Sequence, residues 1–171
     1  MIRSLFARLT GEPRRGQALF DVAVTEARRP QWFLQGEVPD TLNGRFAVLA
    51  TITALIMVRL ERDGPAGEQT SVALTERLVE SLDTEFREMG VGDPTLGKQV
   101  RKLVGAVSAR VDRWRALLQT DADWTDEIRR SMYLDEPANP NAVTYSESEL
   151  RRMWRQFNDA SIDRLSDGRL G

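Results

Sequence analysis

Apolar residues recur at three- and four-residue steps along most of the chain, a spacing that predicts helices. The clearest pattern follows Asp93 and Pro94, where the apolar positions fall within about 100° of one helix face. Those positions are Val100, Leu103, Val104, Val107, Val111, Trp114 and Leu118. No segment shows the alternation of Val, Ile and Thr that is typical of strands. The sequence therefore predicts an all-α fold, a single compact multi-helix domain with a C-terminal amphipathic helix.

The longest apolar stretch, Phe46–Val58, lies within a helix that we predict for Thr41–Leu60. Because this helix is apolar on nearly all sides, we expect it at the centre of the core. The stretch is shorter than the roughly 20 residues that cross a bilayer, so we predict no membrane span. The N-terminus has no apolar region of signal-peptide length, and we therefore expect a cytoplasmic protein.

Prolines, glycines and capping residues mark the other helices, which are predicted for Gln17–Arg28, Ser71–Met89 and Trp124–Met132. Ser146 and Glu149 fit a capping box, so the last helix is expected to begin there. Its apolar stripe could pack on the same core or mediate dimerisation; it consists of Leu150, Met153, Trp154 and Phe157. The expected organisation is a basic amphipathic segment (1–16), a helical domain (17–134), a loop (135–146) and a C-terminal helix with a tail (147–171).

Histidine and cysteine are both absent from the sequence. Their absence excludes disulfides, zinc sites built on Cys and His, Ser–His or Cys–His nucleophile pairs and a haem held by His. A general base would have to be Asp, Glu, Lys or Tyr, and no constellation points to one. We therefore predict no catalytic residue, no cofactor and no metal site, and an enzyme that uses the carboxylates or Lys98 stays open as an alternative at this stage.

Two local patterns resemble ligand sites but have simpler explanations. Residues 92–98 match the spacing GxxxxGK of a phosphate-binding loop, yet Gln99 stands where that motif needs Ser or Thr, and no strand precedes it. Four acids between 121 and 127 lack the glycine and the distal glutamate of a calcium loop. Acidic residues at the start of a helix are explained by its dipole.

Charge is unevenly distributed along the chain. Residues 98–115 hold six basic residues and one acid, whereas residues 121–149 hold eight acids and two arginines. Four cations lie opposite the apolar stripe of their helix, namely Lys98, Arg101, Lys102 and Arg113. They form either a solvated face or a platform for a lipid surface, ribosomal RNA or an acidic partner. The net charge of −2 argues against DNA binding by the molecule as a whole.

The first nine residues form a second basic pattern, with Ile2, Leu5, Phe6 and Leu9 at helical spacing and arginines nearby. Such a segment can lie on a membrane surface or fold back on the domain. Both interpretations remain open at this stage.

Two blocks of the sequence resemble the ubiquinol–cytochrome c chaperone family. The first block is Ala27–Phe33, followed by Gly36, residues 38–41 and residues 44–46. The second block is residues 82–83 and 87–93, followed by Lys98 and residues 100–102. The resemblance spans about Gln17 to Tyr133, and the tail beyond Tyr133 is expected to lie outside it.

The resemblance implies a non-enzymatic assembly factor for ubiquinol–cytochrome c reductase that holds newly made cytochrome b. In the family, mitochondrial members work with a small partner protein near the ribosomal tunnel exit, and bacterial members are short and cytoplasmic. A small partner assembly factor, the ribosome and peripheral contact with the inner membrane are thus further candidate partners. The alternative is a helical membrane-surface adaptor that has no dedicated cytochrome b client.

The charged residues of the two blocks, the neighbouring aromatic pair and the basic helix face are the candidate client-binding residues. Aromatic residues beside arginines are typical of binding hot spots. The candidates are Arg28, Arg29, Trp32, Phe33, Arg45, Arg87, Glu88, Lys98, Arg101, Lys102 and Arg113.

Overall fold

The computed structural model describes residues 15–170, all of which belong to helices or to the turns between them. The amphipathic segment expected for residues 1–16 lies outside the described residues, apart from Arg15 and Gly16. No strand occurs between residues 15 and 170, and the all-α prediction is confirmed. The elements are α2 (Gln17–Ala27), α3 (Gln31–Leu34), α4 (Leu42–Leu60), the 3-10 turn η1 (Glu61–Asp63), α5 (Gly64–Glu88), α6 (Asp93–Leu118), α7 (Thr125–Met132), α8 (Pro140–Asp159) and α9 (Ile162–Ser166).

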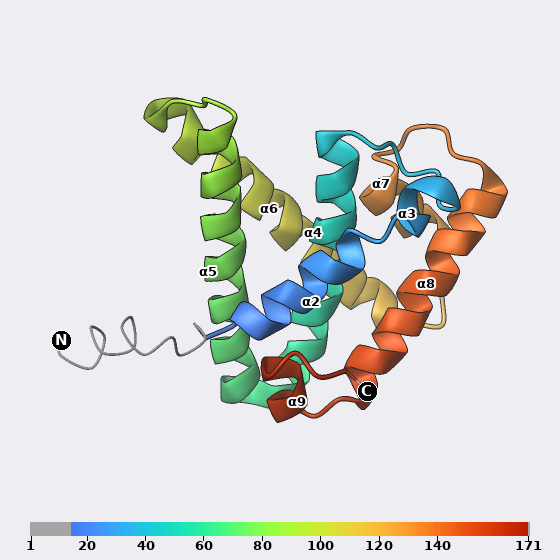
Figure 1. The fold of residues 1–171 in the computed structure, drawn as a ribbon. Helices are drawn as coiled ribbons and strands as arrows, with labels where there is room; N and C mark the ends of the chain where they lie inside the picture. Colours follow the sequence, from blue (N-terminus) through green and yellow to red (C-terminus); the bar gives the residue numbers. More distant parts are fainter. Residues whose placement is uncertain (1–14, 171) are drawn as a thin grey trace.

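Helix α4 lies at the centre of the fold, and α2, α5, α6, α7 and α8 pack around it (Figure 1). Its start is fixed by Thr41, whose hydroxyl accepts a hydrogen bond from the Gly44 amide at 3.1 Å. Its side chains are buried on almost every side, and Leu55 and Ile56 have no exposed surface. The expectation of a central core helix is therefore confirmed.

The helical stretch 42–88 is the one part of the described chain that is long and apolar enough to cross a membrane by length and composition. Most of its apolar window is buried inside the protein. Burial of this kind is the ordinary condition of a core helix, and it accounts for the composition of α4.

Helix α5 begins at Gly64, earlier than the start expected at Ser71. Gly64 has a φ of 56°, which allows the chain to reverse direction after η1. Pro65 then occupies the first turn, where its missing N–H costs no hydrogen bond. At Gly67 a Cβ would lie only 1.8 Å from the Leu60 carbonyl oxygen, so this position has no room for a side chain.

Helix α8 begins at Pro140, and the boundary expected near Ser146 is wrong. Asn139 accepts a hydrogen bond from the Asn141 amide at 3.0 Å and so caps the helix seven residues before Ser146. Ser146 instead lies buried inside α8, where its hydroxyl is 2.8 Å from the Tyr133 hydroxyl. The predicted capping box therefore does not form.

The apolar stripe of α8 packs on the same core as α4 rather than remaining free for a second copy of the chain. Leu150, Met153 and Phe157 have no exposed surface, and Trp154 packs against them at the edge. Buried Arg59 then ties the end of α8 to α4. Its guanidinium donates to the Phe157 and Ala160 carbonyl oxygens at 2.9 and 2.6 Å and also pairs with Asp63.

Candidate functional site

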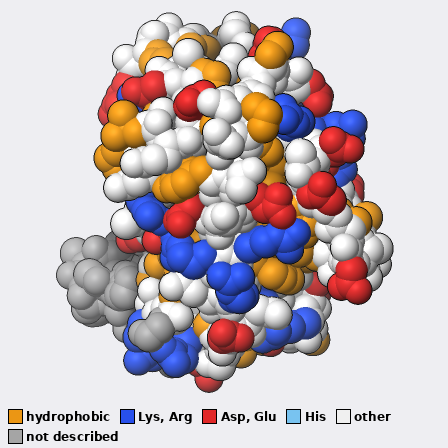
Figure 2. Space-filling view, turned by 90° about the vertical axis from the view of Figure 1, so that its right-hand side faces the viewer, with side chains coloured by type: hydrophobic (Ala, Val, Ile, Leu, Met, Phe, Trp, Pro, Cys, Tyr) orange, Lys and Arg blue, Asp and Glu red, His pale blue; other side chains and the backbone are white. Residues whose placement is uncertain are grey.

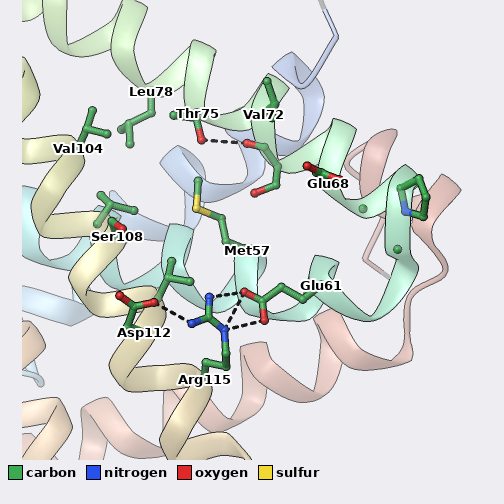
Figure 3. Close-up of a pocket in the computed structure, with 16 residues that line it drawn as sticks. Met57, Glu61, Glu68, Val72, Thr75, Leu78, Val104, Ser108, Asp112 and Arg115 are labelled. Atoms are coloured by element: carbon green, nitrogen blue, oxygen red, sulfur yellow. Dashed lines mark hydrogen bonds and ion pairs between the residues drawn. The ribbon is translucent and has the colours of Figure 1, made fainter.

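A groove of about 710 Å³ opens between α5 and α6, with Met57 of α4 at its base (Figure 3). Apolar side chains from both helices point into it, among them Val72 and Leu78 from α5 and Val104 from α6. The volume is within the range of protein ligand pockets, and the groove is open along one side. It is a surface on which another molecule could bury apolar groups.

The groove exists because α5 and α6 meet at their connecting turn and then diverge along the sides of α4 (Figure 1). Near the start of α5 the lining residues are small, including Gly64, Gly67 and Ser71. On α6, Val107 and Trp114 are buried, whereas Val104 and Val111 stay half-exposed; Val104, Val107 and Val111 all line the groove. The apolar stripe predicted for α6 contains all four of these residues, but the sequence does not predict the groove.

Charged side chains form the rim of the groove at the end near η1 (Figure 3). The Arg115 guanidinium donates to both carboxylate oxygens of Glu61, at 2.6 to 3.0 Å, and to Asp112 at 2.7 Å. These hydrogen bonds, with Glu61 contributing most, raise the pKa of Arg115 above its ordinary value. Glu68 is exposed on the same rim and makes no ion pair within the described chain. The lining of the groove itself holds three carboxylates and one guanidinium, an excess of negative charge, while exposed Arg15 lies with Glu68 in a neighbouring hollow and donates to Gln69 at 2.8 Å.

The turn between α2 and α3 carries the first group of predicted binding residues. Arg28 is exposed, but Arg29 is half-buried in ion pairs with Glu26 at 3.3 Å and with Glu149 of α8 at 2.6 Å. Arg152 of α8 joins the same cluster through Glu26 at 3.0 Å. Arg29 therefore connects α8 to the turn, whereas exposed Arg28 makes no ion pair with any residue between 15 and 170.

Trp32 is a core residue, which corrects the prediction that its side chain faces a client. It is 1% exposed, its indole N–H donates to the Glu26 carbonyl oxygen at 2.8 Å, and its ring meets Tyr145 edge-on. Phe33 is half-buried against the same core, whereas the neighbouring Leu34 is 72% exposed. The expected aromatic and arginine surface is thus reduced to Arg28 and the edge of Phe33.

Charged residues of the second block lie near the turn between α5 and α6. Arg87 pairs with Asp83 at 2.7 Å and with Asp93 at 2.8 Å, so it links the end of α5 to the start of α6. Glu88 is exposed beside it.

At the start of α4, Arg45 pairs with Asp40 at 2.7 Å, and the hydrogen bond from Arg45 lowers the pKa of Asp40.

The predicted basic face of α6 is present over its first half. Lys98, Arg101 and Lys102 are exposed and make no ion pair with any residue between 15 and 170. Arg113 does not belong to this face, because its Nε donates to both oxygens of Glu127 at 2.9 and 3.0 Å. Arg110 lies between them in the sequence but is buried, and desolvation lowers its pKa to about 10.

The structure does not bring the two predicted groups into one surface. Helix α3 lies beside α8, while the turn between α5 and α6 projects from the opposite side of the molecule (Figure 1). On the face formed by α8, basic side chains gather in a band with acidic ones interspersed (Figure 2). Ion pairs neutralise cations of α8 and of the α2–α3 turn locally, as between Arg152 and Glu26 and between Arg29 and Glu149.

Two of the four acidic residues between 121 and 127 serve structural roles, Asp123 and Glu127. Asp123 accepts hydrogen bonds from the amide and the hydroxyl of Thr125 at 3.0 and 2.8 Å, and the amide bond contributes most to lowering the pKa of Asp123. Glu127 pairs with Arg113. Across residues 15–170, no group of three Asp, Glu, His or Cys side chains is arranged to hold a metal ion.

Comparison with known proteins identifies relatives of the whole fold. The family model described as "Ubiquinol-cytochrome C chaperone" matches residues 35–170. The crystal structure of the Cbp3 homolog from Brucella abortus superposes with a TM-score of 0.77 at 24% identity, covering 98% of this chain and 94% of that one. At this identity the likeness establishes the fold. No curated protein sequence matches the chain.

The matched range differs from the range expected from sequence. It includes α8 and α9, so the expectation that the tail beyond Tyr133 lies outside the family resemblance is wrong. It begins after α3 and therefore leaves out four predicted binding residues, Arg28, Arg29, Trp32 and Phe33. All residues that line the groove fall within it.

Proposed function

Since the chain belongs to the ubiquinol–cytochrome c chaperone family, we propose that it is an assembly chaperone for ubiquinol–cytochrome c reductase. In this proposal it binds newly made cytochrome b and catalyses no reaction. The observation that carries the proposal is the family match over residues 35–170, which covers the central helix and the groove beside it. The lack of His and Cys, which removes the commonest catalytic bases and nucleophiles, agrees with a binding role.

The groove between α5 and α6 supports a holding function. A protein that protects a membrane subunit before its insertion needs an apolar surface, because that subunit's lipid-facing side chains are otherwise exposed to water. It also needs charges for the client's polar loops. The apolar groove supplies the first requirement, and the exposed cations Lys98, Arg101 and Lys102 of α6 supply the second.

We place the protein in the cytoplasm, with peripheral contact at the inner membrane. A small partner assembly factor and the ribosome are further proposed contacts. The membrane contact is supported by the turn between α5 and α6, where Met89 is 51% exposed close to the free cations of α6. If that contact were the whole function, the protein would be a membrane-surface adaptor, which flotation with liposomes would detect without any client.

Co-purification from the native host tests the proposal. Deletion of the gene is expected to lower complex III and haem b in membranes, and the tagged protein is expected to carry cytochrome b after crosslinking. Charge reversal at Arg101 and Lys102 is expected to weaken that crosslink. Reversal at exposed Arg155 and Arg164, on α8 and α9, is the matched control and should leave it unchanged. Normal complex III together with no recovered cytochrome b would contradict the proposal.

A further inference from the structure

We propose that the groove between α5 and α6 receives one apolar helical segment of the client that carries Lys or Arg at its end. This inference rests on the proposed function, because it takes the client to be a membrane protein that is met on the cytoplasmic side. It assigns the groove a definite occupant: the cytoplasmic end of a membrane-spanning helix.

The apolar part of the inference comes from the lining. Val72 on the lip of the groove is 54% exposed, and Val104 and Val111 are half-exposed on the opposite wall. Met57 closes the base, and its unbranched thioether adapts to different side chains (Figure 3). Such walls fit the side chains of one helix face, as in other proteins that bind a helix in a groove.

The charged part of the inference comes from the rim. Arg115 is already held by Glu61 and Asp112, so its charge is satisfied within the protein. Glu68 remains on the rim with no ion-pair partner in the described chain. A cation that arrived with the client would meet the excess negative charge of this rim. Loops on the cytoplasmic side of membrane proteins carry an excess of Lys and Arg beside the ends of their spans.

A second copy of this chain fits the groove less well. The large apolar residues that are exposed between positions 15 and 170 are scattered over separate elements rather than aligned on one helix face: Leu34, Leu42, Val72, Met89 and Leu134. The described part of the chain therefore offers no apolar helix face that could enter the groove of another molecule.

The test uses the purified protein and a fluorescein-labelled peptide of about twelve leucine and alanine residues, roughly 18 Å long as a helix. One version of the peptide ends in lysines, and a matched version ends in glutamates. Fluorescence anisotropy is expected to show that the lysine-ended peptide binds about tenfold more tightly than the other, with a difference that shrinks at high salt. Equal binding of both peptides, or binding of neither, would overturn the inference.

Two neighbouring positions on α6 provide the matched variants. Ser108 lines the groove and is exposed, so Ser108→Trp fills the groove without disturbing the core. Ala109 is exposed outside the groove, and Ala109→Trp is the control. We expect Ser108→Trp to weaken peptide binding at least about tenfold and Ala109→Trp to leave it unchanged. Circular dichroism of both variants shows whether each is folded.

Glu68→Lys tests the charge without adding bulk, and exposed Glu136→Lys is its control. Glu68→Lys is expected to remove most of the preference for the lysine-ended peptide. If Ser108→Trp and Glu68→Lys both bind the peptide normally, the groove is not the site. If analytical centrifugation finds a dimer that Ser108→Trp dissociates, a second copy occupies the groove and the inference is wrong.

The peptide-binding experiment and the recovery of cytochrome b test different claims. If cytochrome b still crosslinks to Ser108→Trp, the chaperone role stands, but the groove is not the site where cytochrome b binds. Conversely, selective peptide binding by a protein that never recovers cytochrome b would support the chemistry of the groove and would contradict the identity of the client.

Discussion

The two sides of α4 are built differently. On the side of α8, buried polar side chains bind backbone carbonyl oxygens: Arg59 binds those of Phe157 and Ala160, and Tyr133 binds that of Gly36 at 2.5 Å. On the side of α5 and α6, buried Arg110 also donates to the Ser131 carbonyl oxygen at 2.8 Å, but an open groove lined mainly by apolar side chains lies between the two helices. The α8 side is closed by directional hydrogen bonds that fix one geometry, whereas the groove has non-directional surfaces that can accept different partners.

Arg59→Ala should produce the largest loss of stability on the α8 side. It would leave two carbonyl oxygens and the half-buried Asp63 without their partner, so we expect the free energy of unfolding to fall by about 3–5 kcal/mol. Urea denaturation followed by circular dichroism measures this change. Arg62→Ala is the matched control, because exposed Arg62 binds Asn158 at 2.6 Å at the same end of α8. A loss below about 1 kcal/mol is expected there, and equal losses would contradict the comparison.

Tyr133→Phe should have an intermediate effect. The buried Tyr133 hydroxyl bonds to the Gly36 carbonyl oxygen and to Ser146, and we expect its removal to cost about 1–2 kcal/mol. Thermal and urea denaturation check the value. Tyr145→Phe, on the half-exposed tyrosine of α8, should change the unfolding free energy much less. A double-mutant cycle with Ser146→Ala would show whether the two hydroxyls are coupled.

Substitutions in the groove should have a smaller effect on stability. Val104→Ala enlarges a space that is already open, so we expect a loss of about 1 kcal/mol or less. Leu55→Ala, in the closed core of α4, should instead cost about 2–5 kcal/mol because it creates a new cavity. Similar losses at the two positions would show that the groove is closed in solution.

The smallest expected effect concerns pH. The Thr125 amide holds the pKa of Asp123 below its ordinary value, so the ionised carboxylate stabilises the folded state. That stabilisation is present above about pH 4 and is lost as the pH falls through the lowered pKa. The difference in unfolding free energy between the unmodified protein and Asp123→Asn should therefore vanish in acid.

The helical elements could be predicted from sequence because their signals are local. The apolar character of residues 41–60 predicted α4 and the spacing of apolar residues predicted α6, and the predicted helix Thr41–Leu60 agrees with α4 and its capping residue Thr41. The start of α8 was misplaced because Ser146 and Glu149 have the composition of a cap. In the fold, the Ser146 hydroxyl meets Tyr133, a residue from the other side of the preceding loop. A sequence pattern does not report a contact of that kind.

The candidate site was harder to predict because it depends on how helices lie against each other. Arg113 was predicted to belong to the exposed basic face of α6, but α7 brings Glu127 against it. Trp32 beside two arginines has the composition of a binding surface, yet α8 covers it. The groove itself follows from the divergence of α5 and α6, which neither helix encodes alone.

The bond from Arg59 to Ala160 has a consequence for how the protein is made. The two residues are 101 positions apart, so α4 leaves the ribosome long before the segment around Ala160 that packs against it. At about 5–20 residues per second, translation of the intervening chain takes roughly 5–20 s. During that time one flank of the apolar α4 stays uncovered. The protein that we propose to shelter a nascent membrane subunit thus exposes an apolar helix of its own while it is being synthesised.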